Sequence, residues 1–342
     1  MIFASVQLRH LKVEPLTAAD QNFLRVTILI PLRDDWPCAE ELIRRIDRAT
    51  QSGTYAIDVV LIDDGSIQKC DPSKFAGPFT SVRAIRVLCL RRNLGHQRAI
   101  AIGLAYTYEK RACDAVAVMD ADGEDTPEGL VQLLDAFSAN GGTKAIFAER
   151  SKRSESMLFR VFYHLYRGLH WFLTGVSVRV GNFSVLPAAY LSTLAVLSEL
   201  WNHYAAAVFR SKLPHTMIPI ARGQRISGKS TMNFVALVLH GLSAISVFGD
   251  VVGVRLMIAA LAGSFMAGVG IVVVTAIRSF TNWAIPGWAT YVVATLVVIM
   301  IQLVSVASSF TFFTLSSRMN LGFIPLRDYS LFVEEVPEIY SK

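Results

Sequence analysis

The chain has 342 residues, of which 53% are hydrophobic and 18% charged, and its formal net charge is +6. This length allows one α/β domain plus further elements, and the positive charge favours an anionic partner such as a phospholipid surface or a phosphorylated substrate. The four cysteines lack metal-ligand spacing, which argues against a zinc site and agrees with reduced thiols. Met1 to Phe23 has no continuous apolar core, so it does not resemble a signal peptide and the bulk of the chain is expected in the cytoplasm.

Strand and helix patterns alternate after this first segment. Apolar, β-branched runs predict strands at 25–31, 57–62, 84–90 and 115–119, and helical spacing predicts helices at 36–50 and 95–110. Such alternation predicts a doubly wound, mostly parallel α/β sheet that is covered on both faces. In sheets of this kind, ligands bind in the crevice outside the carboxyl ends of the strands.

Three of the predicted strands end in aspartate-rich clusters. The clusters are Arg33-Asp34-Asp35, Asp63-Asp64-Gly65-Ser66 and the run from Asp120 to Asp125. Polar turn chemistry accounts for any one of them alone, but strand ends share one edge, so the three are expected side by side. Carboxylates of the first two can accept hydrogen bonds from a base or ribose. We therefore predict a nucleotide-diphosphate site at this edge.

Asp120 and Asp122 carry the chemistry of the third cluster. Strand residues two apart point to the same side, so both carboxylates can converge on one hard cation. A divalent ion there would bind a diphosphate and stabilise its charge as it leaves. The chain has neither a GxxxxGK[ST] loop nor GxGxxG after the first strand, which disfavours a kinase or a dehydrogenase.

The basic stretch before residue 231 is a candidate site for a phosphate. It contains Arg222, Arg225, Lys229 and Ser230, and an amphipathic pattern follows over 231–248. One interpretation is an ordinary helix after a solvated basic loop. We favour a helix at the membrane surface with cationic side chains that receive a lipid phosphate, and Arg150 and Arg160 are weaker candidates for the same role.

Two long apolar stretches follow. Residues 251–277 carry Arg255 as their only charge, and residues 288–317 carry none. Each exceeds the roughly 20 residues that a helix needs to cross a bilayer. The short connector between them requires an antiparallel hairpin, and basic residues gather on both flanks. The positive-inside rule therefore predicts two spans with both termini and the catalytic domain in the cytoplasm.

The sequence resembles the family 2 glycosyltransferases, and within them the polyprenyl-phosphate (dolichyl-phosphate-mannose-synthase-like) branch. Five pieces run in family order: TILIPLRDD, VVLIDDGS, RRNLGHQRAIAIGLAY, AVAVMDADGEDTPE and RGQRISGKSTMNFVALVLHGLSAIS. The resemblance covers residues 25–315. It implies a GT-A-type fold, a UDP- or GDP-linked sugar donor, a Mg²⁺ or Mn²⁺ cofactor and a polyprenyl phosphate acceptor, with no role for nucleic acid.

The resemblance also implies roles for individual residues. The nucleotide contacts would be Pro31, Asp35, Asp63, Asp64, Ser66 and Asn93. Asp120 and Asp122 would be catalytic and hold the metal, with Glu124 as a third ligand. Arg225, Lys229, Ser230, Arg150 and Arg160 would receive the acceptor phosphate. His96 is open to two interpretations, a catalytic base or a turn histidine packed near the donor, and we favour the second.

Some positions depart from the family pattern. Asp34-Asp35 stands where relatives have Asn-Glu, and Gly123-Glu124 where they have Leu-Gln. A Gly-Asp-Phe motif appears as Gly181-Asn182-Phe183, so a proposed carboxylate base is missing. A lipid phosphate is already anionic near neutral pH and needs little deprotonation, so this loss is chemically tolerable.

These observations predict five regions. They are an extension (1–24), a GT-A domain (25–222), an acceptor loop with an interfacial helix (223–250), two spans (251–317) and a cytoplasmic tail (318–342). The predicted reaction is inverting, metal-assisted transfer of one sugar to polyprenyl phosphate at the cytoplasmic face. The alternatives are transfer to another lipid and a catalytically silent scaffold. Homo-oligomer formation stays open.

Overall fold

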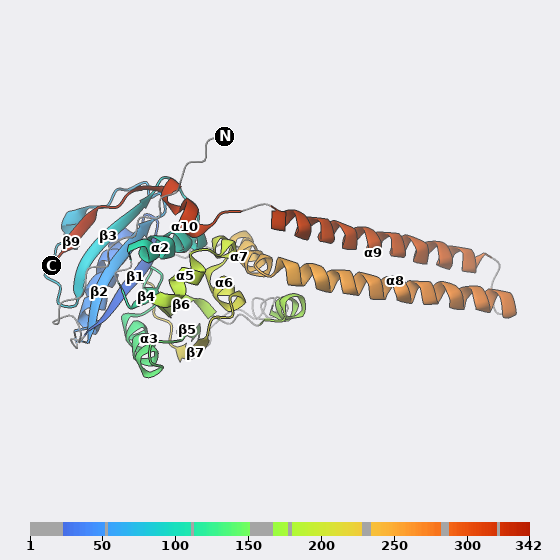
Figure 1. The fold of residues 1–342 in the computed structure, drawn as a ribbon, viewed down its shortest axis with the longest axis horizontal. Coiled ribbons are helices and arrows are strands. Elements are labelled where there is room, and N and C mark those ends of the chain that lie inside the picture. Colours follow the sequence, from blue (N-terminus) through green and yellow to red (C-terminus); the bar gives the residue numbers. More distant parts are fainter. Residues whose placement is uncertain are drawn as a thin grey trace, which may run out of the picture.

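The protein consists of a sheet domain from which two long helices project side by side (Figure 1). The computed structural model describes residues 23–51, 54–110, 113–150, 167–176, 180–227, 234–281, 287–319 and 322–342. Of the predicted regions, nearly all of the 1–24 extension lies outside the described residues.

Nine described strands form one sheet in the order β7-β5-β6-β4-β1-β2-β3-β8, and β9 also pairs with β3. The strands are β1 (Leu24–Leu32), β2 (Tyr55–Asp63), β3 (Val82–Leu90), β4 (Ala115–Val118), β5 (Ala145–Arg150), β6 (Val180–Pro187), β7 (His215–Ile220), β8 (Val333–Glu335) and β9 (Glu338–Ser341). The central strands β4, β1, β2 and β3 are mutually parallel, which confirms the predicted doubly wound sheet. β6 runs antiparallel to both of its neighbours, β4 and β5.

Helices cover both faces of the sheet. The longer helices of the sheet domain are α1 (Trp36–Ala49), α2 (His96–Lys110) and α3 (Pro127–Ala139). The shorter ones are η2 (Pro72–Phe75), η3 (Ala188–Tyr190), α5 (Leu191–Leu194), η4 (Ser198–Trp201) and α6 (Tyr204–Arg210). Successive strand residues point to opposite faces, so Ile28 and Ile30 pack with α1 and α3 while Leu29 packs with α2 and α6. Burial on both faces explains why the central strands are almost uniformly apolar.

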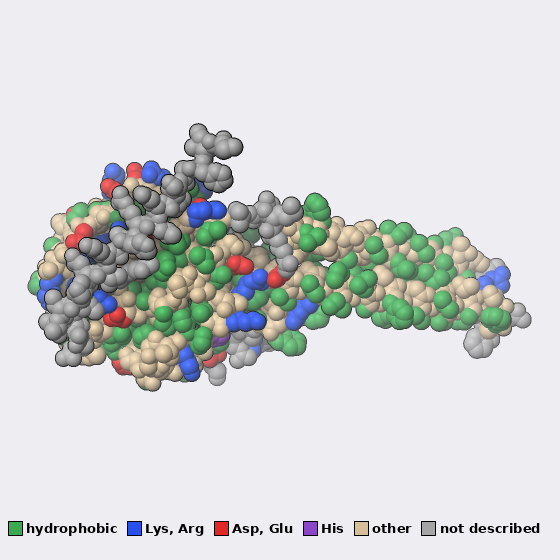
Figure 2. Space-filling model, in the orientation of Figure 1, with side chains coloured by type: hydrophobic (Ala, Val, Ile, Leu, Met, Phe, Trp, Pro, Cys, Tyr) green, Lys and Arg blue, Asp and Glu red, His purple; other side chains and the backbone are tan. Residues whose placement is uncertain are grey.

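The projecting hairpin consists of α8 (Gly249–Phe280) and α9 (Trp288–Met319), and α7 (Phe234–Ser246) precedes it. The most apolar window of each long helix has a mean hydropathy of 2.3, and little of either window is buried. Figure 2 shows no charged side chains on the visible face of the middle of the hairpin, whereas Lys and Arg side chains lie where the hairpin joins the sheet domain. Length and composition therefore allow both helices to cross a membrane.

The C-terminal residues return from the hairpin to the sheet domain. After α10 (Pro325–Asp328) and η5 (Tyr329–Leu331), β8 and β9 pair antiparallel with β3. The Val87 amide donates to the Pro337 carbonyl at 2.9 Å, and the rings of Phe79 and Tyr340 meet edge to face at 4.9 Å. The predicted C-terminal tail thus covers the β3 edge of the sheet.

A buried histidine at the start of α6 makes stability depend on pH. The Ala206 amide donates to Nδ1 of His203 at 3.3 Å, and burial, followed by the nearby His240 and His170, lowers the pKa of His203 to about 3. Unfolded chains protonate this group below about pH 6.5 while the folded protein does not, so its stabilising contribution falls as the pH drops from 6.5 towards 3.

We expect the free energy of unfolding to decrease by about 2 kcal/mol between pH 7 and pH 5 because of His203. Urea unfolding at both pH values measures it. His203→Asn keeps a capping acceptor and should show a smaller pH-dependent loss, whereas His215→Asn, at an exposed position, should behave like the parent protein. An equal loss in all three proteins would contradict the assignment to His203.

Candidate functional site

The predicted clusters meet at one edge of the sheet, where β1, β2, β3 and β4 end. Leu32 pairs with Asp63, and Asp63 pairs with Cys89, in the parallel register. The Asp34 amide donates to Ser66 Oγ at 2.8 Å, which joins the first cluster to the second. The expected side-by-side arrangement of these two strand ends is therefore present.

Asp64 and Gly65, at the end of β2, hold the loop after β3 in place through hydrogen bonds and close packing. The buried Asp64 carboxylate accepts from the Leu94 amide at 2.6 Å and from the Gly95 amide at 2.8 Å. Burial raises the pKa of Asp64, although the two amide hydrogen bonds oppose the rise. Gly65 has φ of 69°, and a Cβ there would lie 2.6 Å from the Asn93 backbone nitrogen. In this structure Asp64 therefore positions the loop.

The other predicted nucleotide contacts occupy the same edge in different settings. Asp35 and Asn93 are exposed, and Asp63 accepts from the Ser66 amide at 2.8 Å. Pro31 is buried within β1, at the position paired with Ile62. The exposed pair leaves polar groups open to a ligand, and the contacts themselves stay predictions.

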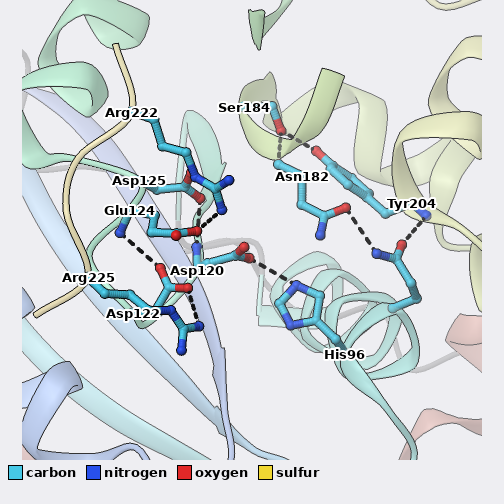
Figure 3. Close-up of polar contacts among 11 residues, drawn as sticks. His96, Asp120, Asp122, Glu124, Asp125, Asn182, Ser184, Tyr204, Arg222 and Arg225 are labelled. Carbon is cyan, nitrogen blue, oxygen red and sulfur yellow. Dashed lines mark hydrogen bonds and ion pairs between the residues drawn. The ribbon is translucent and has the colours of Figure 1, made fainter. Parts of the chain in front are cut away.

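An acidic loop and a basic loop lie against each other beside these strand ends. We call residues 120–125 the acidic loop and residues 221–227 the basic loop. Arg225 donates to Asp122 Oδ2 at 2.6 Å, and Arg222 forms an ion pair with Glu124 (Figure 3). Arg225, a predicted contact of the acceptor phosphate, thus lies against a predicted metal ligand, and its role at the phosphate stays a prediction.

Backbone contacts hold the two loops together. The Ile226 amide donates to the Asp122 carbonyl at 2.9 Å, and the Gly223 amide donates to the Glu124 carbonyl at 2.8 Å. Gly123 has φ of 82°, and a Cβ there would lie 2.5 Å from Ile226 Cγ1. Glycine is therefore required at position 123 for this close approach.

Asp120 faces His96 at the start of α2. The distance from His96 Nε2 to Asp120 Oδ1 is 3.0 Å, and the Asp120 amide donates to Asp125 Oδ2 at 2.9 Å. Desolvation lowers the pKa of His96, but the carboxylates of Asp120, Asp125 and Asp64 outweigh it and raise the pKa above its usual value. In this structure His96 is therefore a direct partner of the Asp120 carboxylate.

The carboxylates suit a divalent cation chemically, because hard oxygen ligands are those that Mg²⁺ and Mn²⁺ prefer. Asp120, Asp122 and Glu124 nevertheless each face a basic side chain. Within the described ranges, no group of three or more His, Cys, Asp or Glu side chains is placed to hold a metal ion. An ion would therefore bind by exchange, with the arginines moving away from the acidic loop, and the predicted metal site stays a prediction.

Two polar residues next to this site, Gln97 and Asn182, had no predicted role. Gln97 Nε2 donates to Asn182 Oδ1 at 3.1 Å, and Gln97 Oε1 accepts from the Tyr204 amide at 2.7 Å. Asn182 is 7% exposed. The position of Gln97 next to His96, in the first turn of α2, was the signal that could have found it.

The remaining acceptor candidates are less informative. Lys229, Ser230 and Arg160 lie outside the described residues. Arg150 is the last residue of β5 and pairs with Ile220 of β7. A small pocket adjoins the two loops and is lined by Glu124, Asp125, Ala148, Gly181, Phe183, Ile220, Ala221 and Arg222.

The chain is similar to known glycosyltransferases. Residues 27–191 match the family model of glycosyl transferase family 2. A match to the uncharacterized glycosyltransferase YkcC of Bacillus subtilis is 22% identical and covers 79% of this chain and 82% of that protein. A match to the undecaprenyl-phosphate 4-deoxy-4-formamido-L-arabinose transferase of Pseudomonas fluorescens is 26% identical and covers 77% and 76%.

A protein of the latter name from Edwardsiella ictaluri is 26% identical, over 66% of this chain and 72% of that protein. Among solved structures, glucosyl-3-phosphoglycerate synthase from Mycobacterium tuberculosis, in complex with Mn²⁺, UDP and glucosyl-3-phosphoglycerate, matches with a TM-score of 0.47 and 14% identity. That match covers 67% of this chain and 80% of the synthase. Residues 27–191 thus form a family 2 glycosyltransferase domain on a mostly parallel α/β sheet, and the protein is a glycosyltransferase.

Proposed function

We propose that this glycosyltransferase moves a single sugar, with inversion, from a UDP- or GDP-linked donor to polyprenyl phosphate at the cytoplasmic face of a membrane, with the aid of Mg²⁺ or Mn²⁺. The observation that carries the proposal is the pairing of the acidic loop with the basic loop, through Asp122 with Arg225 and Glu124 with Arg222. Carboxylates for a metal and cations for phosphates thereby occupy one site. Relatives named as undecaprenyl-phosphate transferases and the apolar hairpin support a lipid phosphate as acceptor.

The reaction needs negative charge to be stabilised in two places. A divalent ion held by Asp120 and Asp122, with Glu124, would stabilise the departing nucleoside diphosphate as a Lewis acid. Once Arg222 and Arg225 have released the carboxylates of the acidic loop, they can donate hydrogen bonds to phosphate oxygens. Because the acceptor phosphate is already anionic, the proposal needs no carboxylate base at Asn182. A single in-line displacement at the anomeric carbon inverts its configuration.

The rest of the edge suits the nucleoside. The exposed Asp35 and Asn93, with Asp63 and Ser66, offer acceptors and donors for a base and a ribose. Asp64 holds the loop that carries Asn93 and His96 against β2. His96 keeps the Asp120 carboxylate in place at 3.0 Å. The donor would thus lie across the ends of β1, β2 and β4.

The membrane orientation is part of the proposal. Helices α8 and α9 would span the bilayer, and both termini would lie in the cytoplasm with the sheet domain. Alkaline phosphatase fused after Lys342 should be inactive, because alkaline phosphatase folds only outside the cytoplasm. A fusion after Thr281, in the connector that follows α8, should be active. The reverse pattern would contradict the orientation.

Sugar transfer by the purified full-length protein in detergent tests the proposal directly. With Mn²⁺, a short polyprenyl phosphate and a panel of labelled UDP- and GDP-sugars, we expect one donor to label the lipid. The product should be stable to base and labile to mild acid, and NMR should show an inverted anomeric configuration. EDTA should abolish transfer.

Two controls separate the alternatives. Polyprenol without phosphate should accept no sugar. Transfer to diacylglycerol in place of polyprenyl phosphate would support the other-lipid alternative. The absence of transfer and of metal-dependent nucleotide binding across the whole panel would overturn the proposed function.

A further inference from the structure

Neighbouring residues fix the orientation of the Asn182 side-chain amide, that is, which way its oxygen and its nitrogen point. The Tyr204 backbone nitrogen can only donate, so the oxygen of Gln97 must face it, at 2.7 Å. The nitrogen of Gln97 then faces Asn182 at 3.1 Å, and only the oxygen of Asn182 can accept from it. Nδ2 of Asn182 is consequently the group turned away from Gln97, and no hydrogen bond from it to a described residue is present.

The strand register places this donor beside the acidic loop. Ala117 pairs with Val185 and Val118 pairs with Ser184 in the antiparallel ladder of β4 and β6. β4 ends two residues before Asp120, and Asn182 lies two residues from Ser184 in β6, so both residues lie at the same end of this ladder. Figure 3 shows the Asn182 side chain across from the Asp120 carboxylate and His96. The free donor therefore lies at the proposed reaction centre.

Further hydrogen bonds hold Asn182 still. The Ser184 hydroxyl donates to the Asn182 carbonyl at 2.8 Å and lies 2.7 Å from the Tyr204 hydroxyl. Ser184 and Tyr204 are both fully buried. Gln97 and Tyr204 thus restrain the side chain and backbone of Asn182 from two elements, α2 and α6, which is the arrangement that a site needs for a fixed hydrogen-bond direction.

The chemistry of a neutral donor at this position favours an anionic oxygen. A carboxylate beside Asp120 would repel a phosphate, whereas an amide N–H attracts one, and hydrogen bonds to charged groups are the stronger class. We propose that Asn182 Nδ2 donates a hydrogen bond to a phosphate oxygen of the acceptor and that Gln97 is the positioning residue that sets its direction. This inference rests on the proposed function, because it takes the acceptor to be a lipid phosphate.

Two substitutions should place an oxygen where the N–H donor of Asn182 now faces the site, and neither changes the size of the side chain. Asn182→Asp replaces the donor by an oxygen. Gln97→Glu keeps the acceptor for the Tyr204 amide but cannot donate, so Asn182 should turn its nitrogen towards position 97 and its oxygen into the site. We expect each change to raise the KM for polyprenyl phosphate by about 10- to 100-fold. The KM for the sugar nucleotide should stay within about twofold, a split that a merely structural defect would not produce.

Gln132→Glu makes the same chemical change on an exposed face of α3 and should leave both KM values unaltered.

Thermal unfolding of each variant checks the fold. Gln97→Glu retains the Tyr204 contact, so it tests the inference even if Asn182→Asp folds poorly. If the parent enzyme is active and Gln97→Glu leaves the KM for polyprenyl phosphate unchanged, the inference about Asn182 is wrong, whereas the proposed function still holds. A rise confined to the donor KM would also overturn it, since Asn182 would then contact the sugar. A parent enzyme that transfers nothing to polyprenyl phosphate would overturn the proposed function itself.

Discussion

Asp122→Asn should lower kcat for sugar transfer by about 100- to 1000-fold, the range observed when one group that stabilises transition-state charge is removed. The substitution preserves size, and its side-chain oxygen can still accept from the Glu124 amide, as Asp122 Oδ1 does at 2.9 Å. It removes the negative charge that would bind a divalent ion. Initial rates measured over a titration of Mn²⁺ will show whether the loss lies in kcat or in the metal requirement.

Glu128→Gln is the matched control for this experiment. Glu128 is exposed in the first turn of α3, directly after the acidic loop, so it has the same charge in the same neighbourhood but no place in the site. Its kcat should stay within about twofold of the parent value. Because Asp122→Asn also leaves Arg225 without its carboxylate partner, thermal unfolding must be compared for both variants. Full activity of Asp122→Asn at saturating Mn²⁺ would refute the catalytic role of Asp122.

Deletion of residues 333–342 should lower the free energy of unfolding of the sheet domain by about 3 to 5 kcal/mol, the range for losing a large buried side chain from a core. The deletion removes β8 and β9, the ring contact between Tyr340 and Phe79, and the ion pair between Arg86 and Glu338. It also bares the edge of β3, whose unpaired backbone groups then face water. Urea unfolding followed by tryptophan fluorescence measures the change.

Leu331→Ala provides the comparison within the same segment. Leu331 is 69% exposed, so its truncation should cost less than about 0.5 kcal/mol. A bared sheet edge also invites pairing between chains, and light scattering should detect self-association of the truncated protein but not of Leu331→Ala. Unfolding of the truncated protein at the same urea concentration as the parent would show that β8 and β9 contribute nothing to stability.

Periodicity explains why the framework could be predicted from the sequence. The runs at 25–31 and 57–62 are buried on both faces in β1 and β2, and their continuous apolar character is a local property of the chain. The apolar stretches at 251–277 and 288–317 correspond in the same way to α8 and α9. Parallel strands end at a common edge, so the position of the aspartate clusters on that edge also followed from the order of elements.

The contacts that define the site depend on residues far apart in the chain. Arg225 and Asp122 are 103 residues apart, and Gln97 and Asn182 are 85 apart. The spacing of residues in the sequence does not distinguish an arginine that pairs with the acidic loop from one that binds a phosphate, because both are basic residues in a glycine-containing stretch.

The class of the fold, the acidic edge of the sheet and the apolar hairpin could be predicted from the residues alone, since each depends on the local pattern of side chains. Three features required the folded chain: Arg222 and Arg225 face Glu124 and Asp122, Gln97 orients Asn182, and the C-terminal strands complete the sheet at β3. Each of these depends on how the loops and strands pack in three dimensions, where distance along the chain has no bearing on which polar groups meet.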